Sequence, residues 1–345
     1  MRVVIIGGGF CGALVAKKLE KNDFIDVVLI DKKSYFEYQP SLHKVISDPS
    51  HIHKLKIDYK NSLRNATIII SEVKEVKSDY VEIKEGIIDF DILIVSTGAD
   101  YPIYLENKEN VHVLKNGQEA LEISNKIVNA NDILIVGAGL IGSEIAGEIL
   151  TKMPEKNLII VHPYDKILKR IPDDASDYTL KFFEKNGAKL ILGEKVVKHI
   201  DDIFVTNKNR NIKADLCIWC TGIKCKPDFM IDFPDNCFSE KKALNVNQFL
   251  QLEGYDNIFV GGDISSIIEE KTARKAENHA KIIAKNINKI LENKQLKSYK
   301  LGTSPMVIGL GDWTGIIFFK YVFPGLFVPG ILKWFIEWWF LHILK

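Results

Sequence analysis

Two short β-branched runs, separated by a glycine-rich turn and an amphipathic segment, open the hydrophobic pattern of the chain. Residues 3–6 and 27–30 contain no polar break, which is typical of strands buried in a parallel sheet. Between them, residues 13–20 carry their apolar side chains on one side and predict a helix. This order of strand, turn, helix and strand predicts a βαβ unit at the start of the chain.

The turn of this unit has the spacing Gly-x-Gly-x-x-Gly, formed by Gly7, Gly9 and Gly12. In a dinucleotide-binding fold the first glycine allows a tight turn, the second lets the backbone approach a pyrophosphate, and the third lets helix and strand pack closely. Asp31 ends the second strand, where a carboxylate can accept hydrogen bonds from ribose hydroxyls. The pattern therefore indicates a dinucleotide site, and a glycine-rich turn in an unrelated α/β domain is the alternative.

The same order of elements recurs in the middle of the chain. The glycines of this second turn are Gly137, Gly139 and Gly142. The flanking strand, helix and strand are expected at residues 133–136, 143–150 and 157–161. The recurrence indicates that a dinucleotide-binding function is present twice. The second copy ends at His162 rather than at an acid.

Two further strands end in the same Thr-Gly dipeptide. Residues 91–96 lead into Thr97 and Gly98, and residues 216–220 lead into Thr221 and Gly222. The strand at 257–260 instead leads into Gly261, Gly262 and Asp263, and a long helix is expected at 272–290. The remaining predicted elements are helices at 41–46 and 115–130 and strands at 67–73, 80–83 and 189–192.

These patterns predict one domain interrupted by another. We expect the first domain at residues 1–114 and 244–300, with the second domain inserted at 115–243 and a separate segment at 301–345.

The C-terminal segment is rich in aromatic residues and poor in charge from residue 315 onward. Two Pro-Gly pairs, at 324–325 and 329–330, leave no run of about twenty apolar residues, which argues against a spanning helix. Residues 331–344 predict a helix with Lys333 and Glu337 on one narrow face. This pattern favours a monotopic anchor in one leaflet of a membrane, and a dimer interface is the alternative.

Composition excludes several classes of protein. The composition, 46% hydrophobic and 26% charged, is typical of a globular protein, and 345 residues are enough for two domains or for one domain with a large insertion. The formal charge of +1 and the lack of a long basic run argue against a nucleic-acid partner. The first strand follows Met1 almost directly, so we expect no cleaved signal peptide and residence on the cytoplasmic side. The five cysteines are scattered, so neither disulfides nor a metal site is expected.

With both glycine turns, both Thr-Gly turns and the Gly-Gly-Asp in place, the chain resembles the two-dinucleotide-binding-domain flavoproteins. It is most similar to the type II NADH:quinone oxidoreductases. The resemblance implies an α/β fold with two Rossmann-like domains of the glutathione-reductase-like type and a C-terminal membrane-anchoring helical segment. It also implies FAD at the first glycine turn and NADH or NADPH at the second.

The resemblance further implies the residues of the site. The expected cofactor contacts beyond the two glycine turns and Asp31 are Phe10, Lys32, Val73, Thr97, Gly98, His162, Gly222 and Asp263. Three residues are expected to take part in catalysis. Pro40 lies in a stretch that the family places beside the flavin, and Glu144 matches a glutamate placed near the nicotinamide. His279 is expected either to relay a proton near the quinone or to be a surface residue.

The function implied by the resemblance is hydride transfer from NAD(P)H to flavin N5, followed by two-electron reduction of a membrane quinone without proton pumping. The enzyme would be a peripheral respiratory protein on the cytoplasmic face of the cell membrane, bound to the bilayer surface through its C-terminal helix, and a homodimer is possible. Two alternatives stay open, a sulfide:quinone oxidoreductase and a redox-sensing protein resembling apoptosis-inducing-factor relatives.

Two departures from the family pattern bear on specificity. His162, followed by Lys166, Lys169 and Arg170, stands where many NADH-using relatives have an acid, so NADPH is a candidate beside NADH. Arg274 and Asn278 replace the two glutamines of a quinone-site motif, so the identity of the quinone stays open.

Overall fold

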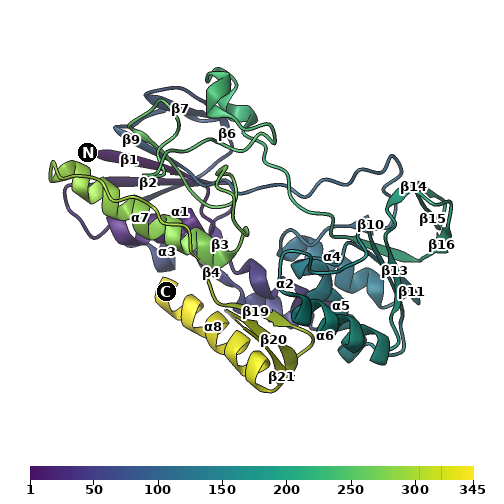
Figure 1. The fold of residues 1–345 in the computed structure, drawn as a ribbon. Coiled ribbons are helices and arrows are strands. Elements are labelled where there is room, and N and C mark those ends of the chain that lie inside the picture. Colours follow the sequence, from purple (N-terminus) through teal and green to yellow (C-terminus); the bar gives the residue numbers. More distant parts are fainter. Residues whose placement is uncertain (303, 320) are drawn as a thin grey trace.

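The computed structural model describes residues 1–302, 304–319 and 321–345. Its first domain is built on a five-stranded parallel sheet (Figure 1). The strand order is β18 (Ile258–Val260), β9 (Ile92–Val95), β1 (Arg2–Ile6), β2 (Asp26–Asp31) and β5 (Thr67–Ile70). Strands from both ends of the domain's sequence therefore meet in one sheet, and the strands of the second sheet lie between them in the sequence.

The two faces of this sheet are covered by different structures because alternate residues of each strand point to opposite sides. Val3 and Ile5 pack with the cluster that includes α1 (Phe10–Leu19) and α7 (Ala273–Leu291). Val4 and Ile6 pack instead with the antiparallel sheet on the other face. That sheet consists of β6 (Val73–Val76), β7 (Tyr80–Ile83) and β8 (Gly86–Asp89).

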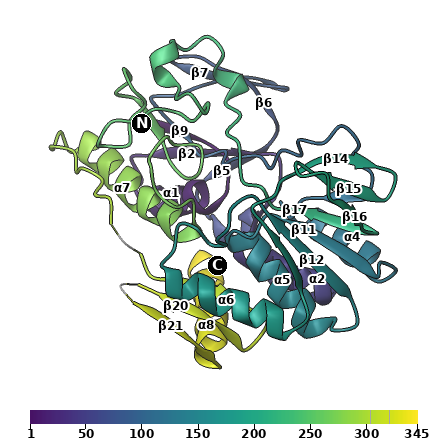
Figure 2. The same cartoon turned by 45° about the vertical axis from the view of Figure 1, so that its right-hand side comes forward.

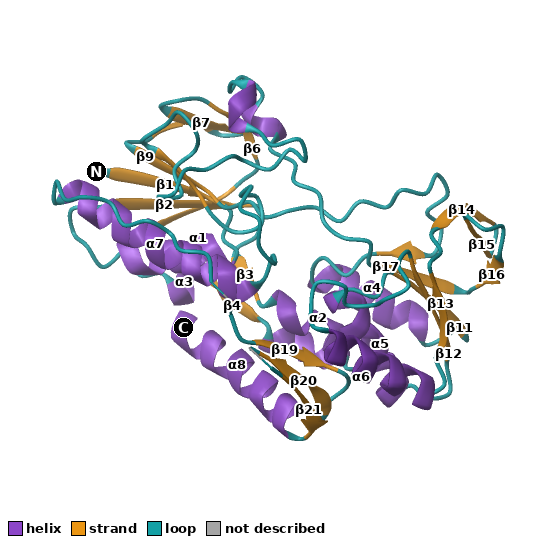
Figure 3. Ribbon diagram, viewed as in Figure 1, coloured by secondary structure: helices purple, strands orange, loops and turns teal. Residues whose placement is uncertain are grey.

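The second domain repeats this plan. Its parallel sheet has the order β10 (Val111–His112), β17 (Leu216–Trp219), β11 (Asp132–Val136), β12 (Asn157–His162) and β13 (Lys189–Leu192). Its helices are α4 (Gly117–Ile127), α5 (Leu140–Lys152) and α6 (Asp173–Lys185), and its small antiparallel sheet is β14 (Val196–Ile200), β15 (Ile203–Thr206) and β16 (Asn211–Lys213). Figure 3 shows the alternation of helix and strand in both domains.

Several predicted boundaries need correction. Both glycine-turn helices begin three residues earlier than predicted, at Phe10 and Leu140, because Gly9 and Gly139 are the N-caps. The strand predicted at 67–73 is two strands, because the chain leaves the parallel sheet after Ile70 and Val73 begins β6 in the antiparallel sheet. Because the connection between β5 and β6 is short, the hydrophobic run at 67–73 contributes residues to both sheets.

The chain crosses between the domains twice, at neighbouring points. Asp100 and Lys224 form an antiparallel bridge where the two crossing segments meet. Val111 already pairs with the second sheet, before the predicted boundary at residue 115. Cys225 packs in the core of the first domain, before the predicted return at residue 244. A bridge between two single residues has no periodic sequence pattern, so these crossing points could not be predicted from the sequence.

One short helical region of the first domain reaches the second domain. It follows β3 (Tyr35–Glu37) and includes η1 (Gln39–Ser41), α2 (Leu42–Ser47) and η2 (Pro49–Lys54), which lead to β4 (Lys56–Asp58) and α3 (Tyr59–Ser62). Helix α2 packs against both α4 and α5. The same first domain also contains η3 (Asp228–Met230) and η4 (Asp235–Cys237).

The C-terminal segment forms a small sheet followed by a helix (Figure 2). The strands β19 (Met306–Gly309), β20 (Thr314–Phe318) and β21 (Val322–Leu326) are antiparallel, and α8 (Val328–Leu344) follows them. The helix begins at Val328 rather than at the predicted residue 331, because a proline in the first turn fits a helix. Pro324 lies inside β21, where an edge strand tolerates it.

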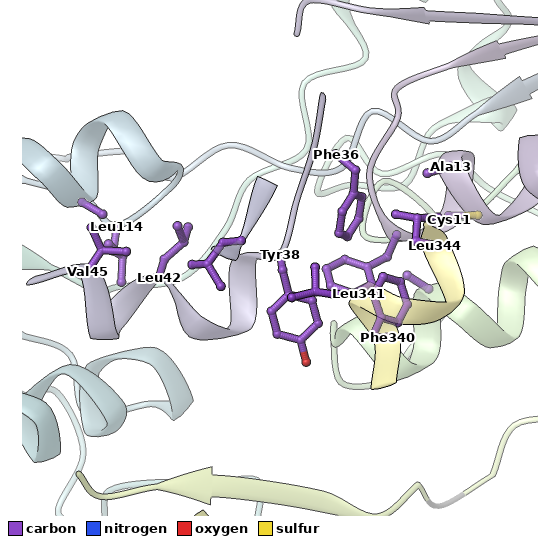
Figure 4. Close-up of a cluster of buried hydrophobic side chains, with 14 of the residues drawn as sticks. Cys11, Ala13, Phe36, Tyr38, Leu42, Val45, Leu114, Phe340, Leu341 and Leu344 are labelled. Atoms are coloured by element: carbon purple, nitrogen blue, oxygen red, sulfur yellow. The ribbon is translucent and has the colours of Figure 1, made fainter. Parts of the chain in front are cut away.

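Helix α8 contacts both domains, through Lys333 with Glu144 of the second domain and through Leu344 with Ser62 of the first. Its last turns place Phe340, Leu341 and Leu344 against Phe36 and Tyr38 of the first domain (Figure 4). Within the described ranges, no helix has both the length and the apolar content needed to cross a bilayer.

Candidate functional site

The first glycine turn lies at the carboxyl end of β1 and has the geometry of a phosphate cradle. Gly7 has a φ of +91°, which favours glycine. A Cβ on Gly12 would lie 1.9 Å from the carbonyl oxygen of Gly7, so only glycine lets α1 approach the turn this closely. A Cβ on Gly9 would meet nothing within 4 Å, and no side chain caps the helix at this residue. The free N–H groups of α1 therefore face open space that fits a pyrophosphate.

Asp31 is held beside this turn. Its carboxylate accepts hydrogen bonds from the backbone N–H of Gly8 at 2.5 Å and from that of Lys33 at 2.8 Å. Tyr59 fixes the turn from below by donating its hydroxyl proton to the carbonyl oxygen of Gly8 at 2.8 Å. The acid thus lies at the carboxyl end of β2, where the adenosine ribose of a bound dinucleotide is expected.

The carboxyl ends of β9 and β18 add residues to the same edge of the sheet. Thr97 and Gly98 follow β9, and a Cβ on Gly98 would meet nothing within 4 Å. Asp263 follows β18, and burial raises the pKa of its carboxyl group while the charge of Lys271 opposes the rise. Within the described residues, the Asp263 carboxylate takes no hydrogen bond. These groups lie where the family resemblance implies contacts with the ribityl and phosphate groups of FAD.

The second glycine turn repeats the geometry of the first. Gly137 has a φ of +106°, a Cβ on Gly142 would lie 1.9 Å from the carbonyl oxygen of Gly137, and a Cβ on Gly139 would meet nothing within 4 Å. At the end of β12, His162 accepts a hydrogen bond at Nδ1 from the N–H of Ala138 at 3.0 Å. Gly222 follows β17 and also has open space where a Cβ would stand.

Glu144 faces the C-terminal segment. Its Oε1 lies 2.6 Å from Lys333 Nζ and accepts a hydrogen bond from the N–H of Gly309 at 3.2 Å. Lys333 Nζ is also 3.3 Å from His43 Nε2, and burial together with the charges of Lys333 and Lys44 lowers the pKa of His43. This cluster joins three parts of the chain, because Glu144 is in α5, His43 in α2 and Lys333 in α8. Sequence reasoning missed Lys333 as a partner of Glu144, since 189 positions separate them.

A second buried carboxylate on α8 also faces the protein. Glu337 lies 3.2 Å from both Lys44 Nζ and His51 Nε2, and it accepts a hydrogen bond from the hydroxyl of Ser41. Lys333 and Glu337 therefore form ion pairs with other segments and not with each other. The two side chains do share one face of the helix, and that face is turned inward.

His279 is buried in α7, so the prediction of a surface residue is wrong. Its Nδ1 accepts a hydrogen bond from the N–H of Gly262 at 3.0 Å, which leaves the ring proton on Nε2, 2.8 Å from Glu269 Oε1. Glu269 also binds Lys275 at 2.8 Å and the hydroxyl of Tyr299 at 2.9 Å. The ring thus supports the turn that precedes Asp263, and its role as a proton relay stays a prediction.

The other predicted contacts lie around the first turn. Phe10 begins α1 and packs edge to face on Phe36, with a centroid distance of 5.1 Å. Pro40 lies in η1, one residue before Ser41. Lys32 is exposed and pairs with Glu72, and Val73 is half-buried. Among the residues that the structure describes, no cluster of His, Cys, Asp and Glu has the makings of a metal site.

The chain is similar in sequence and in fold to several known oxidoreductases. Residues 1–280 match the family described as pyridine nucleotide-disulphide oxidoreductase. Apoptosis-inducing factor homolog B of Dictyostelium discoideum is 30% identical, over 91% of this chain and 88% of its own length. The type II NADH:quinone oxidoreductase of Staphylococcus saprophyticus is 26% identical, over 92% of this chain and 90% of its own. The structure of sulfide:quinone oxidoreductase from Aquifex aeolicus superposes with a TM-score of 0.89 at 18% identity, over 99% of this chain and 91% of that one.

Proposed function

The chain belongs to the pyridine nucleotide-disulphide oxidoreductase family and is an FAD- and NAD(P)H-dependent oxidoreductase, and we propose that its electron acceptor is a quinone dissolved in a membrane. The proposal places FAD at the turn around Gly9 and NAD(P)H at the turn around Gly139. The chemistry that bound FAD supplies is hydride acceptance from NAD(P)H and two-electron reduction of the acceptor.

The observation that carries this proposal is the orientation of α8, whose charged side chains are turned toward the protein and whose apolar side chains are turned toward solvent. The charged side chains inside the helix, Lys333 and Glu337, are turned toward the two domains. The outward face is aromatic and aliphatic, with each side chain at least 40% exposed: Ile331, Trp334, Phe335, Ile336, Trp338, Trp339 and Ile343. An exposed apolar face of this extent fits a bilayer surface, where tryptophan prefers the headgroup boundary. A quinone held in that bilayer would be next to the same helix that contacts Glu144.

The residues of the chain would divide the work as follows. The two glycine turns bind pyrophosphates, and Asp31 binds a ribose. Glu144, held by Lys333 at 2.6 Å, is proposed to orient the nicotinamide end and to hold a proton near the acceptor. Pro40 is proposed to form the wall beside the flavin, and His279 to fix the turn at Gly262. The enzyme would be peripheral, on the cytoplasmic face of the cell membrane.

Thiol chemistry fits the site less well, although the Aquifex aeolicus protein carries sulfide in its name. Burial raises the pKa of the Cys11 thiol and of the Cys220 thiol to about 12 each, so both are protonated at neutral pH. Burial also raises the pKa of Cys217. A protonated, buried thiol is a weak nucleophile.

Anaerobic stopped-flow on the full-length protein tests the proposal. Flavin absorbance is followed on mixing with NADH or NADPH, and then with a soluble quinone. We expect rapid bleaching and rapid recovery. Bleaching by sulfide but not by a nicotinamide cofactor would support the sulfide alternative, and slow bleaching with an oligomeric state that changes on reduction would support a redox sensor like the apoptosis-inducing-factor relatives.

Glu144→Gln is expected to lower the turnover of NAD(P)H with quinone at least about tenfold at unchanged FAD content, because the variant loses the carboxylate that pairs with Lys333. Glu148→Gln is the matched control. Glu148 is one turn along the same helix, is 2% exposed and binds the hydroxyl of Ser47 instead. Equal turnover in both variants would remove Glu144 from the proposed site.

Replacing Trp338 and Trp339 by serine is expected to weaken binding to vesicles of phosphatidylcholine and phosphatidylglycerol by more than about tenfold, because each buried aromatic side chain contributes roughly 1.5–3 kcal/mol. The two residues are 47% and 52% exposed. Phe24→Ser, at a side chain that is 80% exposed outside this face, is the control. If vesicle binding is unchanged and sedimentation shows a dimer becoming a monomer, the face is a dimer interface instead.

A further inference from the structure

The two nucleotide folds of this chain end their second strands differently. Strand β2 ends at Asp31, whose carboxylate is fixed beside the glycine turn. Strand β12 ends at His162, an uncharged or positively charged group at the same place in the second fold. A carboxylate accepts hydrogen bonds from a ribose diol and repels a phosphate on the ribose 2′ position. Only the first fold therefore carries the group that selects against a 2′-phosphate.

His162 also carries an unused donor. Because Nδ1 accepts the N–H of Ala138 at 3.0 Å, the ring proton of the neutral imidazole is on Nε2. Nε2 is buried and has no hydrogen-bond partner in the described part of the chain, and the whole residue is 8% exposed. His162 therefore holds the glycine turn and brings no negative charge to the end of β12.

The loop after β12 folds back over the glycine turn. The N–H of Leu168 donates to the carbonyl oxygen of Ala138 at 3.1 Å, so the loop and His162 hold the same residue. Tyr164 lies edge-on to His162 at 5.6 Å between ring centroids, and Lys169 Nζ lies 4.0 Å from the centre of the Tyr164 ring. These contacts bring a cation close to the end of β12.

A hollow of about 520 Å³ opens beside this loop, and three lysines line it. They are Lys166 and Lys169 from the loop and Lys208 from the turn between β15 and β16. Lys166 is neutralised by Asp173. Within the described residues, neither Lys169 nor Lys208 has a carboxylate within ion-pair distance. Among the described residues that line the hollow, Asp165 is the one acid.

We propose that this hollow binds the 2′-phosphate of NADPH, with Lys169 and Lys208 as its cationic partners. The inference rests on the proposed use of the second fold by a nicotinamide nucleotide. A phosphate monoester carries close to two negative charges at neutral pH, so two unpaired lysines balance it.

The test is binding of 2′,5′-ADP and of 5′-AMP to the FAD-loaded full-length protein, measured by titration calorimetry. We expect 2′,5′-ADP to bind at least about tenfold more tightly, because charge-assisted hydrogen bonds to the extra phosphate are worth that much. The double change Lys169→Ala and Lys208→Ala should remove this preference and leave 5′-AMP binding unchanged. Lys185→Ala, at an exposed lysine of α6, is the control.

Equal binding of the two nucleotides, or an equal loss for both in the double variant, would overturn the proposal. Lys169→Glu gives a second measurement, since a carboxylate at this position should favour 5′-AMP. Binding of these fragments needs neither quinone nor turnover, so failure here differs from failure of the proposed function. If neither fragment binds, the second fold has no nucleotide site, and both the proposed function and the proposed phosphate site are wrong. If 2′,5′-ADP is preferred but the protein reduces no quinone, only the proposed electron acceptor is wrong.

Discussion

Gly12→Ala is expected to yield a destabilised protein without FAD, whereas Gly9→Ala is expected to fold normally and to bind FAD weakly. The two glycines belong to one turn but meet different surroundings. A Cβ on Gly12 would lie 1.9 Å from the backbone carbonyl oxygen of Gly7 and 2.6 Å from Ser96 Oγ. Backbone cannot move aside as a flexible side chain can, so we expect a loss of about 3 kcal/mol in the free energy of unfolding.

Gly9 has ordinary helix-cap backbone angles, with a φ of −72°, and a Cβ there would meet nothing within 4 Å. Alanine therefore fits the protein but fills space that a pyrophosphate needs. The measurements are the ratio of flavin to protein absorbance after purification and thermal unfolding of both FAD-free variants followed by circular dichroism. A Gly9→Ala protein with full FAD content, or a Gly12→Ala protein as stable as the parent, would contradict the assignment of this turn.

Glu337→Gln is expected to destabilise the protein by about 3 kcal/mol at neutral pH, because it leaves Lys44 and His51 without their buried carboxylate. Burial by itself would raise the pKa of Glu337, but the contact with His51, the charge of Lys44 and the hydroxyl of Ser41 outweigh burial and lower this pKa to about 2. The ordinary value is 4.5. The folded-state pKa is thus the lower one, so the carboxylate stabilises the fold above pH 4.5 and loses this contribution as the pH falls toward 2.

Urea unfolding at pH 7 and at pH 3 measures this effect. The parent should lose stability between the two pH values, and the part of this loss that Glu337 causes should be missing in Glu337→Gln. Glu72→Gln is the control, since Glu72 forms an exposed pair with Lys32 that contributes less than about 1 kcal/mol. A Glu337→Gln protein as stable as the parent at pH 7 would mean that Lys44 and His51 find other partners.

Local patterns in the sequence were enough to predict both nucleotide folds. Buried strands such as β1 and β11 are uninterrupted apolar runs, and the glycines of each turn have a spacing that follows from steric contact between residues five positions apart. The Cβ test at Gly12 and Gly142 gives the same 1.9 Å contact to Gly7 and Gly137, so one spacing has one physical cause in both folds.

Contacts between distant segments could not be predicted in this way. The pair of Glu144 and Lys333 and the pair of Lys44 and Glu337 join residues 189 and 293 positions apart, and nothing near either residue signals its partner. The helical pattern of α8 did place Lys333 and Glu337 on one face, but it could not tell whether that face is turned inward or outward. The strands of the C-terminal sheet were missed because Pro324 and Gly325 suggested an interruption rather than an edge strand.

The placement of α8 limits how the proposed membrane-binding face can be removed by engineering. Cutting the chain before α8 would expose Phe10 and Phe36, which pack against this helix. It would also remove the lysine that pairs with Glu144. The hydroxyl of Ser62 would lose its hydrogen bond to the carbonyl oxygen of Leu344, which is 2.6 Å long. Truncation would therefore damage the domains it is meant to release. A variant that lacks the proposed lipid-binding face should keep the full length and replace only outward side chains such as Trp334 and Trp338, so that the helix still packs against both domains.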